Sequence, residues 1–351
     1  MHAAQSGDLV DPRSGRPLRL ETVRTAADGE VFEGRLVADD GTAYPVHDGV
    51  ADFVTGLPGA DPDQGQTAAS FGFKWDSWED VEGSGAYREF RTWYITRYFD
   101  DEDAMVEFMA GRRRILDCGC GSGYSSSIYL TPSFAGELWA GVDISAAVHQ
   151  ARRRFADVPN TLFVRADMMA MPFPEGSFDT VVAEGTLHHT PSTRQALGAV
   201  ARHLQPGGTI LFYVYRKKSA IREFTDDYIR ERVAPLSPEE AMQAVEPLTE
   251  LGRILAELGI EIEVPDIPVL GITGGKYDLQ RFIYWHVAKI YWNDQSNFEE
   301  NNHTNFDWYH PRYAHRQTSD EVRAWCDELG LVVERLYEDE AGITVRATRS
   351  G

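Results

Sequence analysis

The chain has 351 residues, 42% hydrophobic and 25% charged, which are values typical of a globular protein. Its formal charge of −21 argues against a general nucleic-acid or anionic-membrane surface, because the long-range field would repel both. No apolar run approaches the roughly 18 residues of a membrane span, and the N-terminus lacks a secretory signal. Two of the three cysteines, Cys118 and Cys120, are too close for a likely disulfide and are not spaced as zinc ligands. We therefore predict a cytoplasmic, metal-free protein that binds neither nucleic acid nor membrane.

Residues 1–55 are predicted to form a small, separate, strand-rich module, because turn signals separate short alternating runs such as 31–37. A set of residues resembles the zinc-ribbon-like leader found before some bacterial methyltransferases: Pro17, Leu18, Gly41, Tyr44, Pro45, Val46, Asp48, Gly49 and Phe53. The places where that leader has cysteines hold Asp11, Ser14, Val37 and Asp40. Without soft ligands there is no structural zinc, so we expect a degenerate module held by packing alone.

Residues 56–100 are predicted to be a linker followed by an aromatic lid. Residues 56–68 are polar and rich in Pro and Gly, as in a linker. The next residues include Phe71, Phe73, Trp75 and Trp78. These aromatic rings either pack to anchor the linker or form a lid. In a lid, the faces of the rings would attract a cation with an interaction energy of about 0.5–2 kcal/mol. Phe71 and Trp75 are therefore candidate substrate contacts, and residues 101–109 predict an amphipathic helix.

The segment 115–124, ILDCGCGSGY, predicts a strand that ends on Asp117, a glycine turn and then a helix-compatible run over 122–130. This order places a ligand against bare backbone and a helix N-terminus. A dinucleotide fingerprint would read GxGxxG, and a carboxylate at the strand end would repel a phosphate. The segment instead resembles motif I of class I S-adenosyl-L-methionine (SAM)-dependent methyltransferases, D/E-x-G-x-G-x-G, with Gly119, Gly121 and Gly123 in register.

Residues 101–216 are predicted to form the core, and from 113 to 216 strand and helix signals alternate as a doubly wound α/β sheet requires. Strands are expected at 138–143, 161–167, 178–184 and 209–215, helices at 146–155 and 192–204, and a turn at Gly207–Gly208. Further motifs similar to those of the family occur in order: GVDIS, RADMMAMPF, FDTVVAEGTLHHTP and LQPGG. A capped helix over 318–329 and strands at 332–337 and 343–348 would complete a Rossmann-like seven-stranded sheet from 318–351.

Residues 217–317 are predicted to be a helical cap inserted before the last helix, where the family builds substrate pockets. Helices are expected near 218–232, 237–258 and 276–292. Candidates for the acceptor pocket lie in this cap and at its edges: Tyr215, Arg216, Trp285, His286, Trp308, Tyr309, His310 and Arg312.

The resemblance implies that SAM is the cofactor and S-adenosyl-L-homocysteine the product. Ligands in open α/β sheets bind beyond the carboxyl ends of the strands. By resemblance, the amino-acid end of SAM lies against Asp117, Gly119, Cys120, Gly121, Ser122 and Gly123. Asp143 would accept the ribose hydroxyls, with Ile144 on the adenine, and Asp167 would accept the adenine amino group beside Met168. Glu184 would lie beside the sulfonium.

His188 and His189 follow the fourth strand, and a histidine there can take a proton from an acceptor near neutral pH. Alternatively, it only hydrogen-bonds the loop. We predict a SAM-dependent methyltransferase, monomer or homodimer, that acts on a small molecule in specialised metabolism. The alternatives are transfer of the 3-amino-3-carboxypropyl group of SAM, cyclisation of SAM to azetidine-2-carboxylate, an NAD-dependent oxidoreductase, and a non-catalytic SAM-binding protein.

Overall fold

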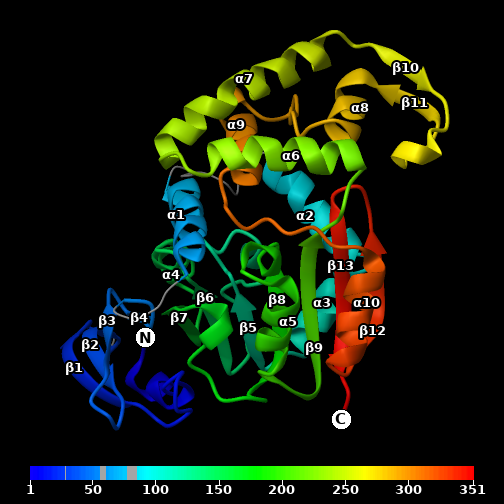
Figure 1. Ribbon diagram of the computed structural model, residues 1–351. Coiled ribbons are helices and arrows are strands. Elements are labelled where there is room, and N and C mark those ends of the chain that lie inside the picture. Colours follow the sequence, from blue (N-terminus) through cyan, green and yellow to red (C-terminus); the bar gives the residue numbers. More distant parts are fainter. Residues whose placement is uncertain (28, 56–60, 77–84) are drawn as a thin grey trace.

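The computed structural model describes residues 1–27, 29–55, 61–76 and 85–351. Its body is built on one mixed sheet, and a cap of helices covers one end of that sheet (Figure 1). The sheet has eleven strands in the order β1-β2-β3-β4-β7-β6-β5-β8-β9-β13-β12. Their bounds are β1 (Arg19–Thr25), β2 (Val31–Val37), β3 (Ala43–His47), β4 (Val50–Asp52), β5 (Arg114–Cys118), β6 (Leu138–Asp143), β7 (Thr161–Arg165), β8 (Phe178–Glu184), β9 (Leu204–Tyr215), β12 (Leu331–Glu338) and β13 (Gly342–Arg349).

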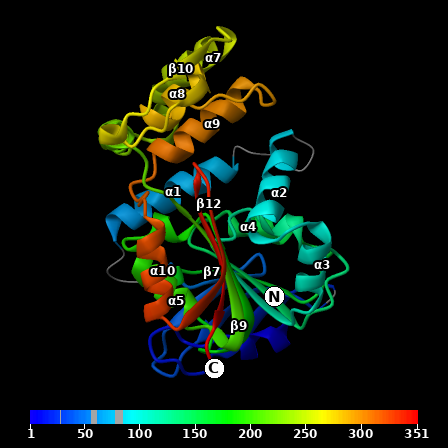
Figure 2. The same ribbon diagram turned by 90° about the vertical axis from the view of Figure 1, so that its right-hand side faces the viewer.

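The seven strands β7-β6-β5-β8-β9-β13-β12 form the doubly wound sheet that the sequence predicts. The first five of these run parallel, whereas β13 lies antiparallel between β9 and β12. Strands buried on both faces are nearly continuous apolar runs, which is why β6 and β8 have the predicted bounds. Helices on the two faces of the sheet are α3 (Glu102–Ala110), α4 (Val148–Arg154), α5 (Thr193–Ala201) and α10 (Ser319–Glu328) (Figure 2). The predicted Rossmann-like fold is confirmed.

The N-terminal strands are continuous with this sheet rather than a separate module. Strand β4 pairs in parallel with β7, with Ala51 opposite Val164 and Asp52 opposite Arg165. The backbone N–H of Phe53 adds a hydrogen bond of 2.7 Å to the carbonyl of Arg165. Side chains of the N-terminal strands and the core strands share one buried apolar cluster. The pairing covers the otherwise open edge of β7, which is a physical reason for the attachment.

Replacing Phe53 with Ala should therefore destabilise the whole body. Phe53 is 1% exposed and stacks on Tyr44 at 4.5 Å between ring centroids. Loss of a buried Phe ring costs about 3–5 kcal/mol. We expect this decrease in the free energy of unfolding within a single urea transition, whereas Val23→Ala, at a side chain 80% exposed in β1, should cost little. A separate early transition for residues 1–55 would contradict the shared core.

In the body, three further predicted elements differ in the structure. Residues from Pro62 onward form α1 (Pro62–Asp76) instead of a linker, and α2 (Gly85–Tyr98) follows it in sequence. Residues 56–60 and 77–84 lie outside the described residues, and so does Trp78 of the predicted lid. After the glycine turn only a short 3-10 helix, η2 (Ser126–Ile128), forms where a longer helix was expected. Strand β9 starts at Leu204, because the Gly207–Gly208 pair makes an irregularity within the strand instead of a turn before it.

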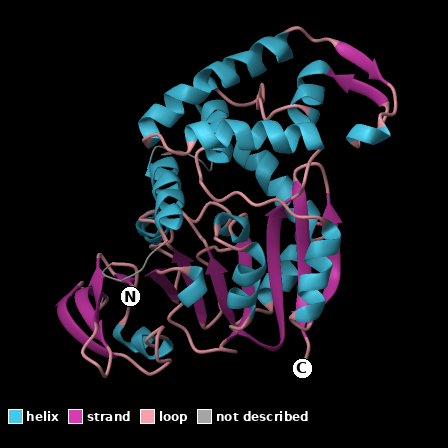
Figure 3. Ribbon diagram, viewed as in Figure 1, coloured by secondary structure: helices cyan, strands magenta, loops and turns pink. Residues whose placement is uncertain are grey.

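The cap consists of helices with one small hairpin, coloured by type in Figure 3. Its elements are α6 (Ala220–Val233), α7 (Pro238–Glu257), β10 (Glu261–Val264), the 3-10 turn η5 (Pro268–Leu270), β11 (Gly275–Asp278), α8 (Leu279–His286) and α9 (Phe298–Tyr309). Further 3-10 turns lie in the body: η1 (Ala3–Asp8), η3 (Met168–Ala170) and η4 (Leu187–His189). The predicted helix over 276–292 is too long at both ends, since α8 ends at His286. At its start, residues 276–278 belong to β11, and the Asp278 side chain caps α8 by accepting a hydrogen bond from the Arg281 N–H. Among the described residues, every helix is too short or too polar to cross a bilayer.

Candidate active site

The turn after β5 presents bare backbone at the carboxyl edge of the parallel strands. Gly119, Gly121 and Gly123 have φ of +79°, +53° and +82°, values that disfavour other residues. A Cβ on Gly119 would lie 2.3 Å from Thr186, and one on Gly121 would lie 2.8 Å from the Trp75 indole nitrogen. The glycines therefore allow close approach of two neighbouring segments to the turn.

The substitution Gly119→Ala should be destabilising for both reasons. The positive φ and the forced contact with Thr186 together should lower the free energy of unfolding by about 2–4 kcal/mol. Gly7→Ala is a suitable control, because nothing lies within 4 Å of a Cβ at that exposed position. Equal urea midpoints for the two variants would contradict this account of the turn.

Two carboxylates at adjacent strand ends face the same cavity as the turn. Asp143 ends β6, and its Oδ2 accepts the Gly121 N–H at 2.8 Å while its Oδ1 accepts the Ser145 N–H at 2.7 Å. Asp167 follows β7 and accepts the Met169 N–H at 2.8 Å. Burial raises the pKa of both carboxyl groups. Each carboxylate oxygen has more than one lone pair, so both groups can still accept ligand hydroxyl or amino groups.

Asp117 has a different place from the one predicted. It is buried, does not line the cavity, and accepts hydrogen bonds from Ser126 and from the Tyr129 hydroxyl, the latter at 2.9 Å. Burial raises the pKa of Asp117 to about 6. The side chain therefore anchors the segment after the glycine turn instead of reaching into the cavity.

Glu184 ends β8 and is held from behind by α2. Its carboxylate accepts from Arg97 at 2.7 Å and from the Tyr98 hydroxyl at 2.5 Å. The Arg97 guanidinium also lies 3.3 Å from the Trp93 ring centroid and 4.6 Å from that of Tyr213. No local pattern marks Arg97, because its partners Glu184 and Tyr213 come from β8 and β9, far along the chain.

The turn, the strand ends, α1 and α9 enclose a cavity of about 300 Å³. Predicted site residues that line it are Phe71, Trp75, Gly119, Cys120, Gly121, Asp143, Ile144, Asp167, Met168, Glu184, His189 and Tyr215. Predicted site residues that do not line it are Asp117, Ser122, Gly123, His188, Arg216, Trp285, His286, Trp308, Tyr309, His310 and Arg312. Lining residues that the sequence analysis missed include Gln64, Lys74, Phe90, Trp93, Tyr213 and Asp307. No local motif marks these residues, because they converge only in the folded chain.

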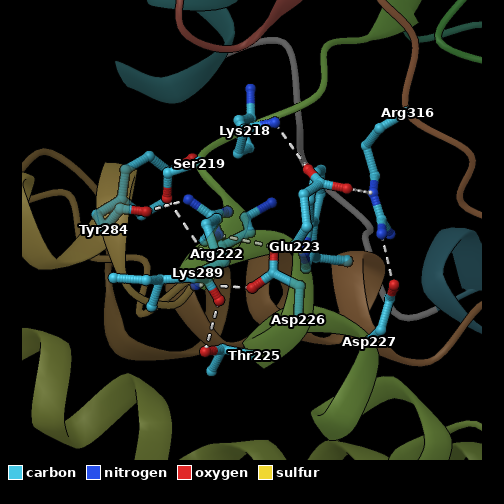
Figure 4. A network of polar contacts seen from close by, with 12 residues as sticks. Lys218, Ser219, Arg222, Glu223, Thr225, Asp226, Asp227, Tyr284, Lys289 and Arg316 are labelled. Atoms are coloured by element: carbon cyan, nitrogen blue, oxygen red, sulfur yellow. Dashed lines mark hydrogen bonds and ion pairs between the residues drawn. The ribbon is translucent and has the colours of Figure 1, made fainter. Parts of the chain in front are cut away.

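Trp308 and Tyr309 hold the cap together instead of lining the pocket. The Trp308 indole N–H and the Tyr309 hydroxyl donate to the buried Asp226 carboxylate at 2.8 and 2.9 Å. Arg222 donates to the same carboxylate at 2.7 Å, and the backbone N–H of Lys289 donates at 3.2 Å; Figure 4 shows Arg222, Asp226 and Lys289 in this network. Asp226 on α6 thereby fixes the C-terminal end of α9.

The other predicted pocket residues that lie outside the cavity have partners elsewhere. Arg216 forms an ion pair of 2.6 Å with Glu338 on β12. The Arg312 side chain forms an ion pair of 3.4 Å with Asp63 on α1. Trp285 packs against Tyr284 at 4.4 Å between ring centroids. These three side chains therefore join the cap to the body or pack within the cap.

The two adjacent histidines have different environments. His189 lines the cavity, and its Nδ1 lies 2.6 Å from the Tyr313 carbonyl oxygen. A carbonyl can only accept, so Nδ1 carries the proton and Nε2 has a lone pair, to which no described residue donates. Burial lowers the pKa of His189 to about 4, so the ring is neutral. His188 lies behind the cavity with its ring centroid 3.8 Å from that of Tyr215.

Comparison with known proteins identifies the domain to which this site belongs. Residues 116–212 match the family model described as a methyltransferase domain. The chain is 30% identical over 149 residues to a phthiotriol/phenolphthiotriol dimycocerosates methyltransferase of Mycobacterium ulcerans, covering 41% of this chain and 55% of that protein. It is 33% identical over 172 residues to the 27-O-demethylrifamycin SV methyltransferase of Amycolatopsis mediterranei, covering 48% and 61%.

Among solved structures, the chain is similar to the 1,6-didemethyltoxoflavin-N1-methyltransferase of Burkholderia thailandensis, with a TM-score of 0.43 and 12% identity over 94% of this chain and 100% of that chain. The chain spans little more than half the length of the two curated relatives named above, 55% and 61%. Residues 116–212 of this chain therefore match a methyltransferase domain.

Proposed function

We propose that the protein is a SAM-dependent methyltransferase that methylates a hydroxyl group of a small hydrophobic molecule. One observation carries the proposal: the glycine turn, two strand-end carboxylates and a neutral histidine line the same cavity. Two of the relatives are named as methyltransferases of phthiotriol-type and rifamycin-type compounds, which supports a small hydrophobic acceptor. All three cysteines are buried and free, which supports a reducing, cytoplasmic location.

The residues at the strand ends suit SAM. The Gly119–Gly121 backbone would lie against its amino-acid end, where side chains other than glycine would collide with Thr186 or Trp75. Asp143 would accept the ribose hydroxyls, and Asp167 the adenine amino group, with apolar Ile144 and Met168 nearby. When bound, SAM supplies a methyl group on a positively charged sulfur.

The remaining part of the cavity would hold and activate the acceptor. Phe71, Trp75 and Tyr215 give it aromatic walls, which suit an apolar molecule. His189 Nε2 would accept the proton of the acceptor hydroxyl, while the Tyr313 carbonyl fixes the ring. Helix α1 covers the cavity and is tied to the cap, since Ser70 lies 2.8 Å from His310 Nδ1. The chain thereby holds the acceptor in a fixed orientation away from bulk water.

Product analysis tests this proposal. The purified protein would be incubated with SAM, with and without extract of the host cell, and the nucleoside product identified by mass spectrometry. We expect S-adenosyl-L-homocysteine. Methylthioadenosine would instead indicate 3-amino-3-carboxypropyl transfer or cyclisation to azetidine-2-carboxylate. Calorimetric binding of SAM without either product, across a broad acceptor panel, would support a non-catalytic SAM-binding role.

A further inference from the structure

Asp307 is a cap residue whose carboxylate faces the cavity. It lies on α9, which packs against α1 above the sheet (Figure 2). Its Oδ2 is 3.1 Å from the Lys74 ammonium on α1, and the two side chains are 19% and 14% exposed. Its Oδ1 is buried, and none of the described residues donates a hydrogen bond to it. A buried carboxylate oxygen without a donor is costly, so this atom is well placed for a donor that enters the cavity.

The position of Asp307 is fixed by its neighbours in sequence. Trp308 and Tyr309 are anchored by Asp226, as described above. His310 is held by Ser70 of α1 and by the Leu236 carbonyl, at 2.8 and 3.1 Å. The orientation of Asp307 is therefore set by the junction between α1 and the cap before any ligand arrives.

The carboxylate is ionised despite its burial. Burial opposes ionisation, but the ammonium groups of Lys74 and Lys289 lower the pKa of Asp307 below its ordinary value. Lys289 has no hydrogen-bonded partner for its ammonium group among the described residues, and that group lies 4.5 Å from the Trp308 ring centroid. The end of the cavity that would hold the methylated molecule therefore presents two atoms that can accept hydrogen bonds, Asp307 Oδ1 and His189 Nε2.

We infer that Asp307 selects the acceptor by receiving a hydrogen bond from a second hydroxyl or amino group beside the hydroxyl that is methylated. This inference rests on the proposed function. It names the acceptor class as a hydrophobic diol or amino alcohol that is neutral or cationic. A carboxylic acid is excluded as the preferred acceptor, because its ionised carboxylate has no hydrogen to donate to Asp307 Oδ1.

Matched acceptors test the inference. Catechol and 2-aminophenol carry the second donor, whereas phenol lacks it and benzoic acid carries a negative charge instead. Formation of S-adenosyl-L-homocysteine would be followed for the wild type and for Asp307→Asn. We expect the wild type to prefer catechol and 2-aminophenol over phenol in kcat/KM by about 10–100-fold, as for a hydrogen bond to a charged group. The variant should lose this preference, mainly through a higher KM for catechol and 2-aminophenol.

Controls separate this inference from the proposed function. Glu299→Gln removes one negative charge from an exposed position of the same helix and should keep the preference. Any of three results would overturn the inference. They are a catechol preference that survives in Asp307→Asn, a higher rate with benzoic acid than with catechol, and SAM binding without conversion of catechol or 2-aminophenol. Failure of the wild type to bind SAM would overturn the proposed function as well.

Discussion

Asp143→Asn is expected to weaken SAM binding by about 100–1,000-fold. The carboxylate at the end of β6 lines the cavity and is oriented by the Gly121 and Ser145 N–H groups. Two hydrogen bonds from ribose hydroxyls to a charged acceptor contribute about 3–4 kcal/mol together, which corresponds to this loss. Isothermal titration calorimetry with SAM and with S-adenosyl-L-homocysteine measures it directly.

The matched control is Asp157→Asn, which removes the same charge from an exposed residue after α4. It should leave the dissociation constant within about twofold, because a single exposed charge has little effect. Thermal melting without ligand shows whether the Asp143 variant is folded. A folded Asp143 variant with wild-type affinity would show that the ribose does not lie at this strand end.

His189→Asn is expected to reduce kcat by about 100-fold or more without changing SAM affinity. The amide nitrogen of Asn can still donate to the Tyr313 carbonyl, but the lone pair of Nε2 is lost. General-base catalysis contributes about 10²–10⁴-fold, which sets the size of the effect. Single-turnover kinetics at saturating SAM measure the step. An unchanged kcat would leave His189 as a residue that only holds the loop.

His203→Asn is the control for this substitution. His203 is likewise buried, its Nδ1 lies 3.3 Å from the Pro174 carbonyl, and burial lowers its pKa to about 4, yet it does not line the cavity. We expect a similar loss of stability and a wild-type kcat. A comparable loss of kcat in both variants would point to packing as the cause.

The pH dependence of stability follows from the same histidine. Burial lowers the pKa of His189 from 6.5 to about 4, so the unfolded chain takes up the proton first as the pH falls. The neutral ring contributes fully to the free energy of unfolding above pH 6.5. This contribution is lost as the pH falls from 6.5 to 4, which lowers the free energy of unfolding by up to about 3 kcal/mol. Urea unfolding of His189→Asn should show a smaller decrease over this window than the wild type. An identical decrease in both proteins would contradict the assignment.

The sequence by itself determined the features that depend on local pattern. The bounds of β6 and β8 follow from apolar runs buried on both faces, and the Thr318–Glu321 capping box begins α10. Asp143 and Asp167 stand directly after predicted strands. Carboxyl ends of parallel strands share one edge, so their meeting at one cavity follows from the fold class.

Only the tertiary structure decided which distant residues complete the cavity. Lys74 of α1 and Asp307 of α9 line the cavity, and Arg97 of α2 holds Glu184 from behind it. Nothing in the neighbouring residues marks these three. Trp308 was predicted at the pocket from its residue type, but it faces Asp226 of α6, a partner 82 positions away. The pairing of β4 with β7 is also invisible in either segment alone. Long-range contacts of this kind depend on how separate elements pack, and a residue's own sequence neighbours carry no information about them.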